Sequence, residues 1–219
     1  MKKTSAQEAV ASIKDGAVLM IGGFMSNGTP EILVDALIEK GVKDLTVIAN
    51  DSGTPNTGIG KLVKAGAIRK LIVSHIGLNP LTGQLMHEGK MDVQLVPQGT
   101  LAEQIRAGGA GLGGVLTPTG LGTEVQAGKE IIEVDGKKYL MEKAIKADFA
   151  LIRASIADEK GNLFYKATTR NFNPLMAMAA ETVIVAAEEV VPSGGLEAEC
   201  IVTSGIFVDY LVEGEPYVS

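Results

Sequence analysis

Residues 15–30 read DGAVLMIGGFMSNGTP, and this stretch decides the fold of the chain. The apolar run at 17–21 is typical of a strand that is buried on both faces. Thr29 can then cap a helix, Pro30 suits its first turn, and glycines join strand to helix. A strand that runs through a short glycine-rich loop into a helix is the repeating unit of a parallel α/β sheet.

The surrounding sequence repeats this alternation. Ser5 and Glu8 form a capping-box pattern that predicts a helix through Lys14. Apolar residues of the next helix share one face, and Gly41 can end it. Further strands are expected at 45–49, 71–74 and 93–96, and further helices at 60–65, 81–89 and 101–107. The sequence therefore predicts an α/β fold with an open, mostly parallel sheet flanked by helices.

The pattern changes after Thr123. Residues 130–134 and 138–141 alternate like strands around Asp135-Gly136, which suits a type I′ turn. Later strands are expected at 149–154 and 182–186. We therefore expect residues 1–219 to form a single domain with a small antiparallel hairpin excursion near 129–142.

Composition narrows the classes of function. The chain has 219 residues, 46% hydrophobic and 21% charged, as in ordinary globular proteins. No apolar run approaches the roughly 18 residues of a membrane span, and no signal-peptide pattern follows the first lysines. The net charge of −6 argues against nucleic-acid binding. The single cysteine, Cys200, excludes an internal disulfide and fits the cytoplasm. Two histidines and one cysteine do not suggest a metal site.

Glycine or small polar residues follow four of the predicted strands. These segments are Gly22-Gly23, Asn50-Asp51, Ser74-His75 and Pro97-Gln98-Gly99. Ligands of open parallel sheets bind outside the carboxyl ends of the strands, so the pattern favours a cleft at this edge. The alternative is that these loops are simply polar.

His75 lies at one of these strand ends. It is either a catalytic base or a histidine hydrogen-bonded within a loop.

The loop at 22–28 is the sharpest local feature. Free amides at the start of the following helix would face an anion, and the glycines would let a ligand approach the main chain. The alternative is a tight turn with no ligand. No P-loop is present. The pattern Gly109-x-Gly111-x-x-Gly114 follows a helical segment rather than a strand, so it does not indicate dinucleotide binding, although 108–114 could still shape a loop at a reacting centre.

Residues 15–30 resemble the first signature of the class I CoA-transferases. That signature has an acid or Asn, Gly, two residues, three aliphatics, Gly-Gly-Phe, three residues, Gly, one residue and Pro, and every fixed position is met. The likeness spans nearly the whole chain. It continues through Asn50-Asp51, 56–60, 97–101, 108–123 and Asn171-Phe172-Asn173-Pro174.

The resemblance implies the α subunit of such an enzyme, with an open α/β fold shared with sugar-phosphate isomerases. It implies a CoA-binding loop made of Gly22, Gly23, Phe24, Met25, Ser26, Asn27 and Gly28. It also implies a β-subunit partner, usually in an α₂β₂ assembly, that carries the nucleophilic glutamate in a Glu-Asn-Gly motif. No glutamate of this chain precedes an asparagine, so no catalytic residue is expected here.

The substrates implied are short-chain acyl-CoA and free acids such as acetate, butyrate and acetoacetate, with CoA as substrate and no tightly bound cofactor. Two other functions remain open. One is a sugar-phosphate isomerase or deaminase that uses an acid or His75 as a base. The other is a non-enzymatic domain that senses a phosphorylated metabolite, although this chain has neither the spare length nor the basic charge for an attached DNA-binding module.

Overall fold

The structure, a computed structural model, describes residues 1–214. The strands are β1 (Lys2–Lys3), β2 (Val18–Ile21), β3 (Leu45–Ile48), β4 (Ile68–Val73), β5 (Asp92–Leu95), β6 (Gly114–Thr117), β7 (Ile131–Val134), β8 (Lys137–Lys143), β9 (Ala147–Asp158), β10 (Leu163–Phe164), β11 (Ala180–Val191) and β12 (Tyr210–Glu213). The helices are α1 (Ala6–Ala9), α2 (Glu31–Lys40), α3 (Ile59–Lys64), α4 (Pro80–His87), α5 (Gln98–Gly109) and α6 (Asn173–Met176).

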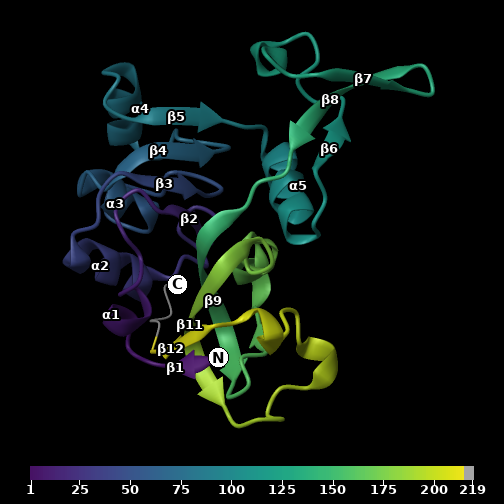
Figure 1. The fold of residues 1–219 in the computed structure, drawn as a ribbon. Coiled ribbons are helices and arrows are strands. Elements are labelled where there is room, and N and C mark those ends of the chain that lie inside the picture. Colours follow the sequence, from purple (N-terminus) through teal and green to yellow (C-terminus); the bar gives the residue numbers. More distant parts are fainter. Residues whose placement is uncertain (215–219) are drawn as a thin grey trace.

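The main sheet has the strand order β1-β12-β11-β9-β2-β3-β4-β5, and all of these strands run parallel. The chain first builds outward from β2 to β5, then returns to place β9 on the other side of β2 (Figure 1). The order therefore reverses between β2 and β9. In open parallel sheets the carboxyl edge at such a reversal is where ligands bind.

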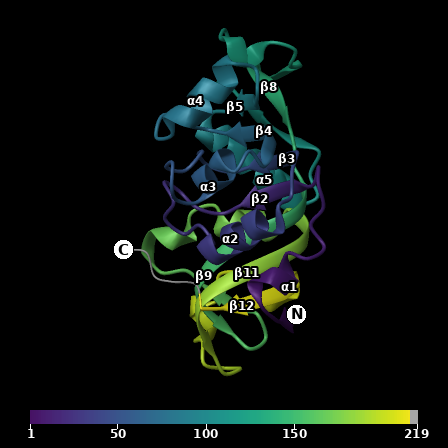
Figure 2. The same cartoon turned by 90° about the vertical axis from the view of Figure 1, so that its left-hand side faces the viewer.

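Helices cover both faces of this sheet. Helices α1 to α4 pack in sequence on one face, and Figure 2 shows α2 and α3 in front of the strands. Helices α5 and α6 pack together on the other face. Alternate residues of β2 enter the two cores: Leu19 and Ile21 face one and Met20 the other, each 0% exposed. The apolar run at 17–21 is continuous because this central strand is buried on both sides.

The predicted fold class is confirmed, as is the hairpin. Strands β7 and β8 pair antiparallel around Asp135 and Gly136, whose φ angles of 51° and 73° suit a type I′ turn. The hairpin is not isolated, however. It pairs with β6 to form a three-stranded sheet that projects away from the main one (Figure 1). Strand β6 was not predicted because its four residues begin with a glycine and follow a glycine-rich stretch.

Two details of the predicted helices are wrong. Helix α1 ends at Ala9 instead of continuing to Lys14, although Ser5 does accept a hydrogen bond from the Glu8 amide. The N-cap of α2 is Pro30 and not Thr29, and Pro30 makes no side-chain cap bond. Thr29 is buried, and a Cβ on Gly23 would lie 2.0 Å from its Oγ1. The Thr29 hydroxyl therefore packs closely under the preceding loop.

The turn after β9 depends on one buried carboxylate. Asp158 accepts hydrogen bonds from the amides of Lys160 and Asn162, both at 2.9 Å, and from the Asn162 side chain at 2.8 Å. Burial alone would raise the pKa of Asp158, but these donors outweigh it and hold the pKa below the ordinary value of 3.8. The ionised form is thus the one that the fold stabilises.

We predict that Asp158→Asn lowers the free energy of unfolding by about 1–3 kcal/mol at pH 7, because it removes charge-assisted hydrogen bonds. A carboxylate with a lowered folded pKa stabilises the protein above its unfolded pKa, and this contribution is lost as the pH falls through the folded pKa. Urea unfolding at pH 7 and pH 3 measures the difference between the two proteins. A difference in unfolding free energy that is as large at pH 3 as at pH 7 would contradict a stabilising role for the ionised Asp158.

Candidate functional site

The loop at 22–28 leaves β2 at the reversal of strand order, between β9 and β3. It opens with the Gly22 amide donating to the Leu151 carbonyl of β9 at 2.9 Å. Phe24 and Asn27 then exchange main-chain hydrogen bonds, both 2.9 Å, across a two-residue turn. The predicted loop therefore lies at the edge of the sheet where a ligand site is expected.

The tip of this turn holds two side chains in an unfavourable backbone conformation. Met25 and Ser26 have φ angles of 50° and 66°, which suit a type I′ turn but are uncommon for residues other than glycine. Such conformations cost of order 1–3 kcal/mol each and persist where the surroundings fix them. Phe24 and Met25 are nevertheless 40% and 54% exposed, so the tip presents large apolar side chains to solvent.

Most main-chain amides of the loop are already bonded within the protein. Gly22, Gly23, Phe24, Met25 and Asn27 donate to Leu151, Asn171, Asn27, Asp51 and Phe24 respectively. The other two of the seven amides, those of Ser26 and Gly28, have no acceptor within residues 1–214. The bonded amides fix the shape of the loop, and the amides of Ser26 and Gly28 are the ones left open.

A second glycine-containing loop supports the first. Asp51 follows β3, is buried, and accepts hydrogen bonds from the amides of Met25 at 2.7 Å and Gly53 at 2.8 Å. Farther along, the hydroxyls of Ser26 and Thr57 lie 2.7 Å apart. The two strand-end loops therefore brace each other, and the Asn50-Asp51 segment noted in the sequence is part of the same site.

The support extends to α5 through side-chain amides. The Asn50 amide nitrogen donates to Asp51 at 2.7 Å, and Asn50 Oδ1 accepts from the exposed Gln98 at 2.6 Å. Ser74 donates to the Asn50 carbonyl at 2.7 Å. Polar groups after β3, β4 and β5 thus form one connected network at the carboxyl edge, at three of the four strand ends singled out in the sequence. Gln98 begins α5 instead of lying in a loop, because Pro97 caps that helix.

A cavity of about 590 Å³ lies beside the loop. It is lined by Phe24, Met25, Asn27, Thr168 and Asn171. The last two belong to a third wall, residues 167–173, which arrives after β10 from far along the sequence. The sequence pointed to Asn171 and Asn173 only through a family resemblance, since nothing local in the sequence reveals a contact across more than 140 residues.

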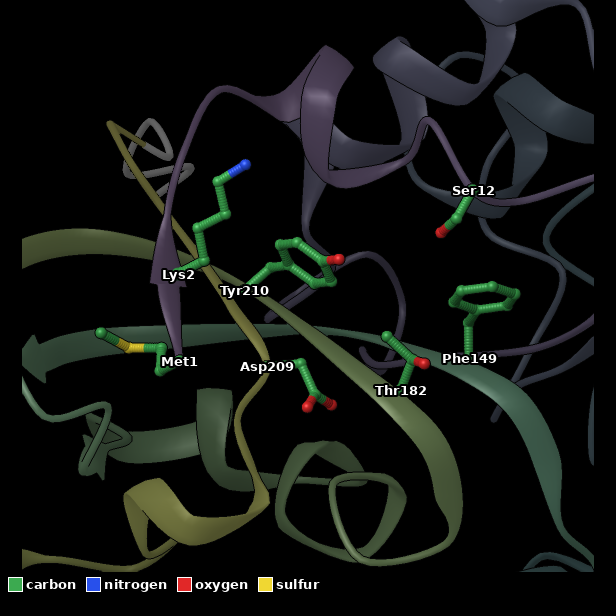
Figure 3. Close-up of a pocket in the computed structure, with 7 residues that line it drawn as sticks. All are labelled: Met1, Lys2, Ser12, Phe149, Thr182, Asp209 and Tyr210. Atoms are coloured by element: carbon green, nitrogen blue, oxygen red, sulfur yellow. The ribbon is translucent and has the colours of Figure 1, made fainter.

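A second hollow, also about 590 Å³, lies on the opposite edge of the main sheet (Figure 3). Phe149, Thr182 and Tyr210 stand at or near the starts of β9, β11 and β12, and Lys2 and Met1 close it. Its one carboxylate, Asp209, accepts the Val183 amide at 2.8 Å. Ligands of parallel sheets bind at the carboxyl edge, so this hollow is not the candidate site.

Two other segments singled out in the sequence lie apart from the loop. Gly108 and Gly109 line a small cavity with Ala147 and Ala180, which begin β9 and β11. A Cβ on Gly108 would lie 2.0 Å from the Ile145 carbonyl oxygen, so close packing accounts for this glycine. His75 follows β4 and is exposed, and its carbonyl accepts the Ser52 amide at 3.2 Å.

The described part of the chain offers no obvious metal centre. Within residues 1–214, no three His, Cys, Asp or Glu side chains are grouped so that they could hold a metal ion. No helix in the same range is long and apolar enough to cross a membrane.

A family model described as Coenzyme A transferase matches residues 3–214. The chain belongs to the coenzyme A transferase family. The resemblance seen at 15–30 is thus confirmed over almost the whole chain, and the isomerase and sensor alternatives are not supported.

Two relatives are similar over more than nine tenths of their length. The chain is 54% identical to the acetate CoA-transferase subunit alpha of Escherichia coli, covering 96% of each chain. It is also 54% identical to the acetoacetyl-CoA:acetate/butyrate CoA transferase alpha subunit of Clostridium acetobutylicum, covering 91% of this chain and 92% of that one.

A solved acyl-CoA transferase of Escherichia coli, in a thioester complex with CoA, superposes with a TM-score of 0.85 at 27% identity. The match covers 96% of this chain but only 46% of that one, so this chain spans about half the length of that protein. Glutaconate coenzyme A-transferase from Acidaminococcus fermentans shares the fold, with a TM-score of 0.85 at 19% identity over 97% of this chain and 75% of that one.

We predict that Gly28→Ala lowers CoA transfer by the assembled enzyme roughly tenfold or more, because small displacements of a binding loop are costly. Gly28 has φ 75°, and a Cβ there would lie 3.0–3.1 Å from Asn171, Asn173 and Thr169. Steady-state kinetics with acyl-CoA measures the effect.

The matched control is Gly41→Ala at the end of α2. Gly41 has φ 76°, but a Cβ at this position would meet no atom within 4 Å. Both variants carry the same backbone cost of about 1 kcal/mol. Equal activity losses in the two variants would show that strain, not the loop, is responsible.

Proposed function

We propose that the chain is the α subunit of an enzyme that moves CoA between short-chain acyl-CoA and free short-chain carboxylates such as acetate, butyrate and acetoacetate. The single observation that carries this proposal is the 54% identity to two α subunits whose names state acetate or acetate/butyrate chemistry. The coverage of at least 91% on both sides supports an equivalent role for the whole chain.

The site fits a long thiol carrier better than a compact ligand. The walls of the cavity beside the loop combine the apolar Phe24 and Met25 with the polar Asn27, Thr168 and Asn171. A pantetheine arm has the same mixture, since its short hydrocarbon segments alternate with amides. The amides of Ser26 and Gly28 could serve its acceptors.

The nucleophile belongs, in this proposal, to a β subunit. This chain has no Glu-Asn-Gly sequence. The carboxylate nearest the loop, Asp51, accepts three hydrogen bonds, from Met25, Gly53 and Asn50, and these bonds reduce its availability for attack. These observations support a glutamate supplied by another polypeptide, and an α₂β₂ assembly in the cytoplasm is the arrangement we propose.

The reaction proceeds by double displacement. The partner's ionised glutamate attacks the thioester carbonyl, the carbon–sulfur bond breaks, and an acyl–glutamyl anhydride and CoA thiolate form. The thiolate attacks the glutamyl carbonyl, which releases the first carboxylate and leaves a glutamyl–CoA thioester. A second acid reverses these steps and leaves as its CoA ester. No net proton transfer, metal or tightly bound cofactor is required.

A carboxylate is a weak nucleophile, so contacts distant from the reacting atoms must lower the barrier. Binding energy from the nucleotide and pantetheine can be used in this way only if the protein holds those groups rigidly. The braced loop at 22–28 meets this requirement, because Asp51 and Thr57 of one neighbouring loop and the wall at 167–173 bond to it. We assign this chain the task of orienting CoA.

We predict that the purified chain alone is inactive and that activity appears on co-expression with a second polypeptide containing Glu-Asn-Gly. The assay follows transfer from acetyl-CoA to butyrate or acetoacetate. Incubation with acyl-CoA without acceptor acid, followed by mass spectrometry of proteolytic fragments, locates the CoA adduct.

The control is the pair in which the partner's glutamate is changed to alanine, which should bind CoA without transferring it. Turnover by the single chain, or an adduct mapped to this chain, would contradict the division of roles. Ribose 5-phosphate and glucosamine 6-phosphate serve as negative substrates, since conversion of either would favour an isomerase.

A further inference from the structure

Two asparagines of the third wall bond to both ends of the loop at 22–28. Asn171 accepts the Gly23 amide at 3.2 Å and donates to the Asn27 carbonyl at 3.0 Å. Asn173 donates to the Gly28 carbonyl at 3.0 Å. These three bonds join residues separated by 144–148 positions in the sequence.

The asparagines are themselves held firmly. Asn173 is 0% exposed, donates also to the Thr169 carbonyl at 2.8 Å, and accepts the Arg153 amide of β9 at 3.1 Å. Asn171 donates also to the Thr168 carbonyl at 2.7 Å and accepts the Phe172 amide at 2.6 Å. Each side chain therefore has several fixed partners, and its position is set independently of any ligand.

The glycines of the loop make room for these two side chains. A Cβ on Gly22 would lie 1.7 Å from Asn173 Oδ1, and a Cβ on Gly28 would lie 3.0 Å from Asn171 Nδ2 and 3.1 Å from Asn173 Nδ2. No larger residue fits at Gly22 without moving Asn173. The loop therefore packs at Gly22 and Gly28 directly against the Asn-Phe-Asn segment at 171–173.

We infer that Asn171 and Asn173 are positioning residues for CoA, acting through the loop at 22–28. The inference rests on the proposed function. The pair fixes the loop at Gly23, Asn27 and Gly28, while Asp51 fixes Met25 from the other side. The strained turn at Met25 and Ser26 is thereby kept in one conformation, and its apolar tip and the unbonded amides of Ser26 and Gly28 are presented before CoA arrives.

The test compares Asn171→Ala with Asn162→Ala in the assembled two-subunit enzyme. Asn162 is a matched control, because its side chain also fixes a loop, donating to Asp158 at 2.8 Å and accepting the Gly205 amide at 2.9 Å, but it bonds to none of residues 22–28. Michaelis constants for acyl-CoA and for the acceptor acid are measured separately, with calorimetric binding of CoA and thermal unfolding alongside.

Asn171→Ala is expected to raise the Michaelis constant for acyl-CoA and the dissociation constant of CoA about tenfold, with the constant for the acid changed less than about twofold. Asn162→Ala is expected to lower thermal stability and leave both constants unchanged. Asn171→Asp is a second variant: it keeps the acceptor for Gly23 but cannot donate to Asn27, so the same selective rise is expected.

Several outcomes would overturn the inference. Unchanged CoA constants in both Asn171 variants, equal effects on acyl-CoA and acid, or the same kinetic change in Asn162→Ala would each show that Asn171 is only structural. These results differ from those expected if the proposed function is wrong. If it is wrong, the wild-type pair itself transfers no CoA.

Discussion

The structure depends on the contact of a central strand's loop with a segment that follows almost 150 residues later. Gly22 lies so close to Asn173 that a single methyl group would overlap the side-chain oxygen. That closeness is available because β9 lies directly beside β2 in the sheet, with Ile21 opposite Leu151. The reversal of strand order thus brings a glycine-rich loop and an asparagine-rich turn together at the edge where parallel sheets bind ligands.

This arrangement changes the physical account of the loop. Free main-chain donors at a helix start are the usual basis of anion binding, yet five of the seven amides here are bonded inside the protein. The N-cap of α2, Pro30, also makes no side-chain cap bond. The loop is therefore better described as a rigid, mainly apolar edge with two open amides. Rigidity of this kind reduces the ordering cost when a flexible arm such as pantetheine binds.

Much of the fold could be predicted because its determinants are local. The apolar run at 17–21, Gly41 at the end of α2 and Asp135-Gly136 in the hairpin each act through near neighbours in the chain, and each is found as expected. The short strands β1 and β12 were not predicted. They form only by pairing at the sheet edge, and β1 is two residues long. The polar segments of the carboxyl edge could be located from the strand ends, although a cleft was predicted there and not a hydrogen-bonded network. The wall at 167–173 depends on topology that local patterns do not contain. The CoA-binding assignment of 22–28 itself stays a prediction.

The order of the chain also has a consequence for biosynthesis. The first 110 residues contain β2 to β5 with their helices, a half-sheet of sequential βα units in which each strand pairs with the next along the chain. These units leave the ribosome before the rest of the chain, and N-terminal parts of a protein begin to fold first during synthesis. The loop at 22–28 nevertheless lacks its bonds to Asn171 and Asn173 until residue 173 has emerged. A nascent or prematurely terminated polypeptide that ends before residue 171 would therefore hold this loop through the bonds of Asp51 and Thr57, without those of the two asparagines.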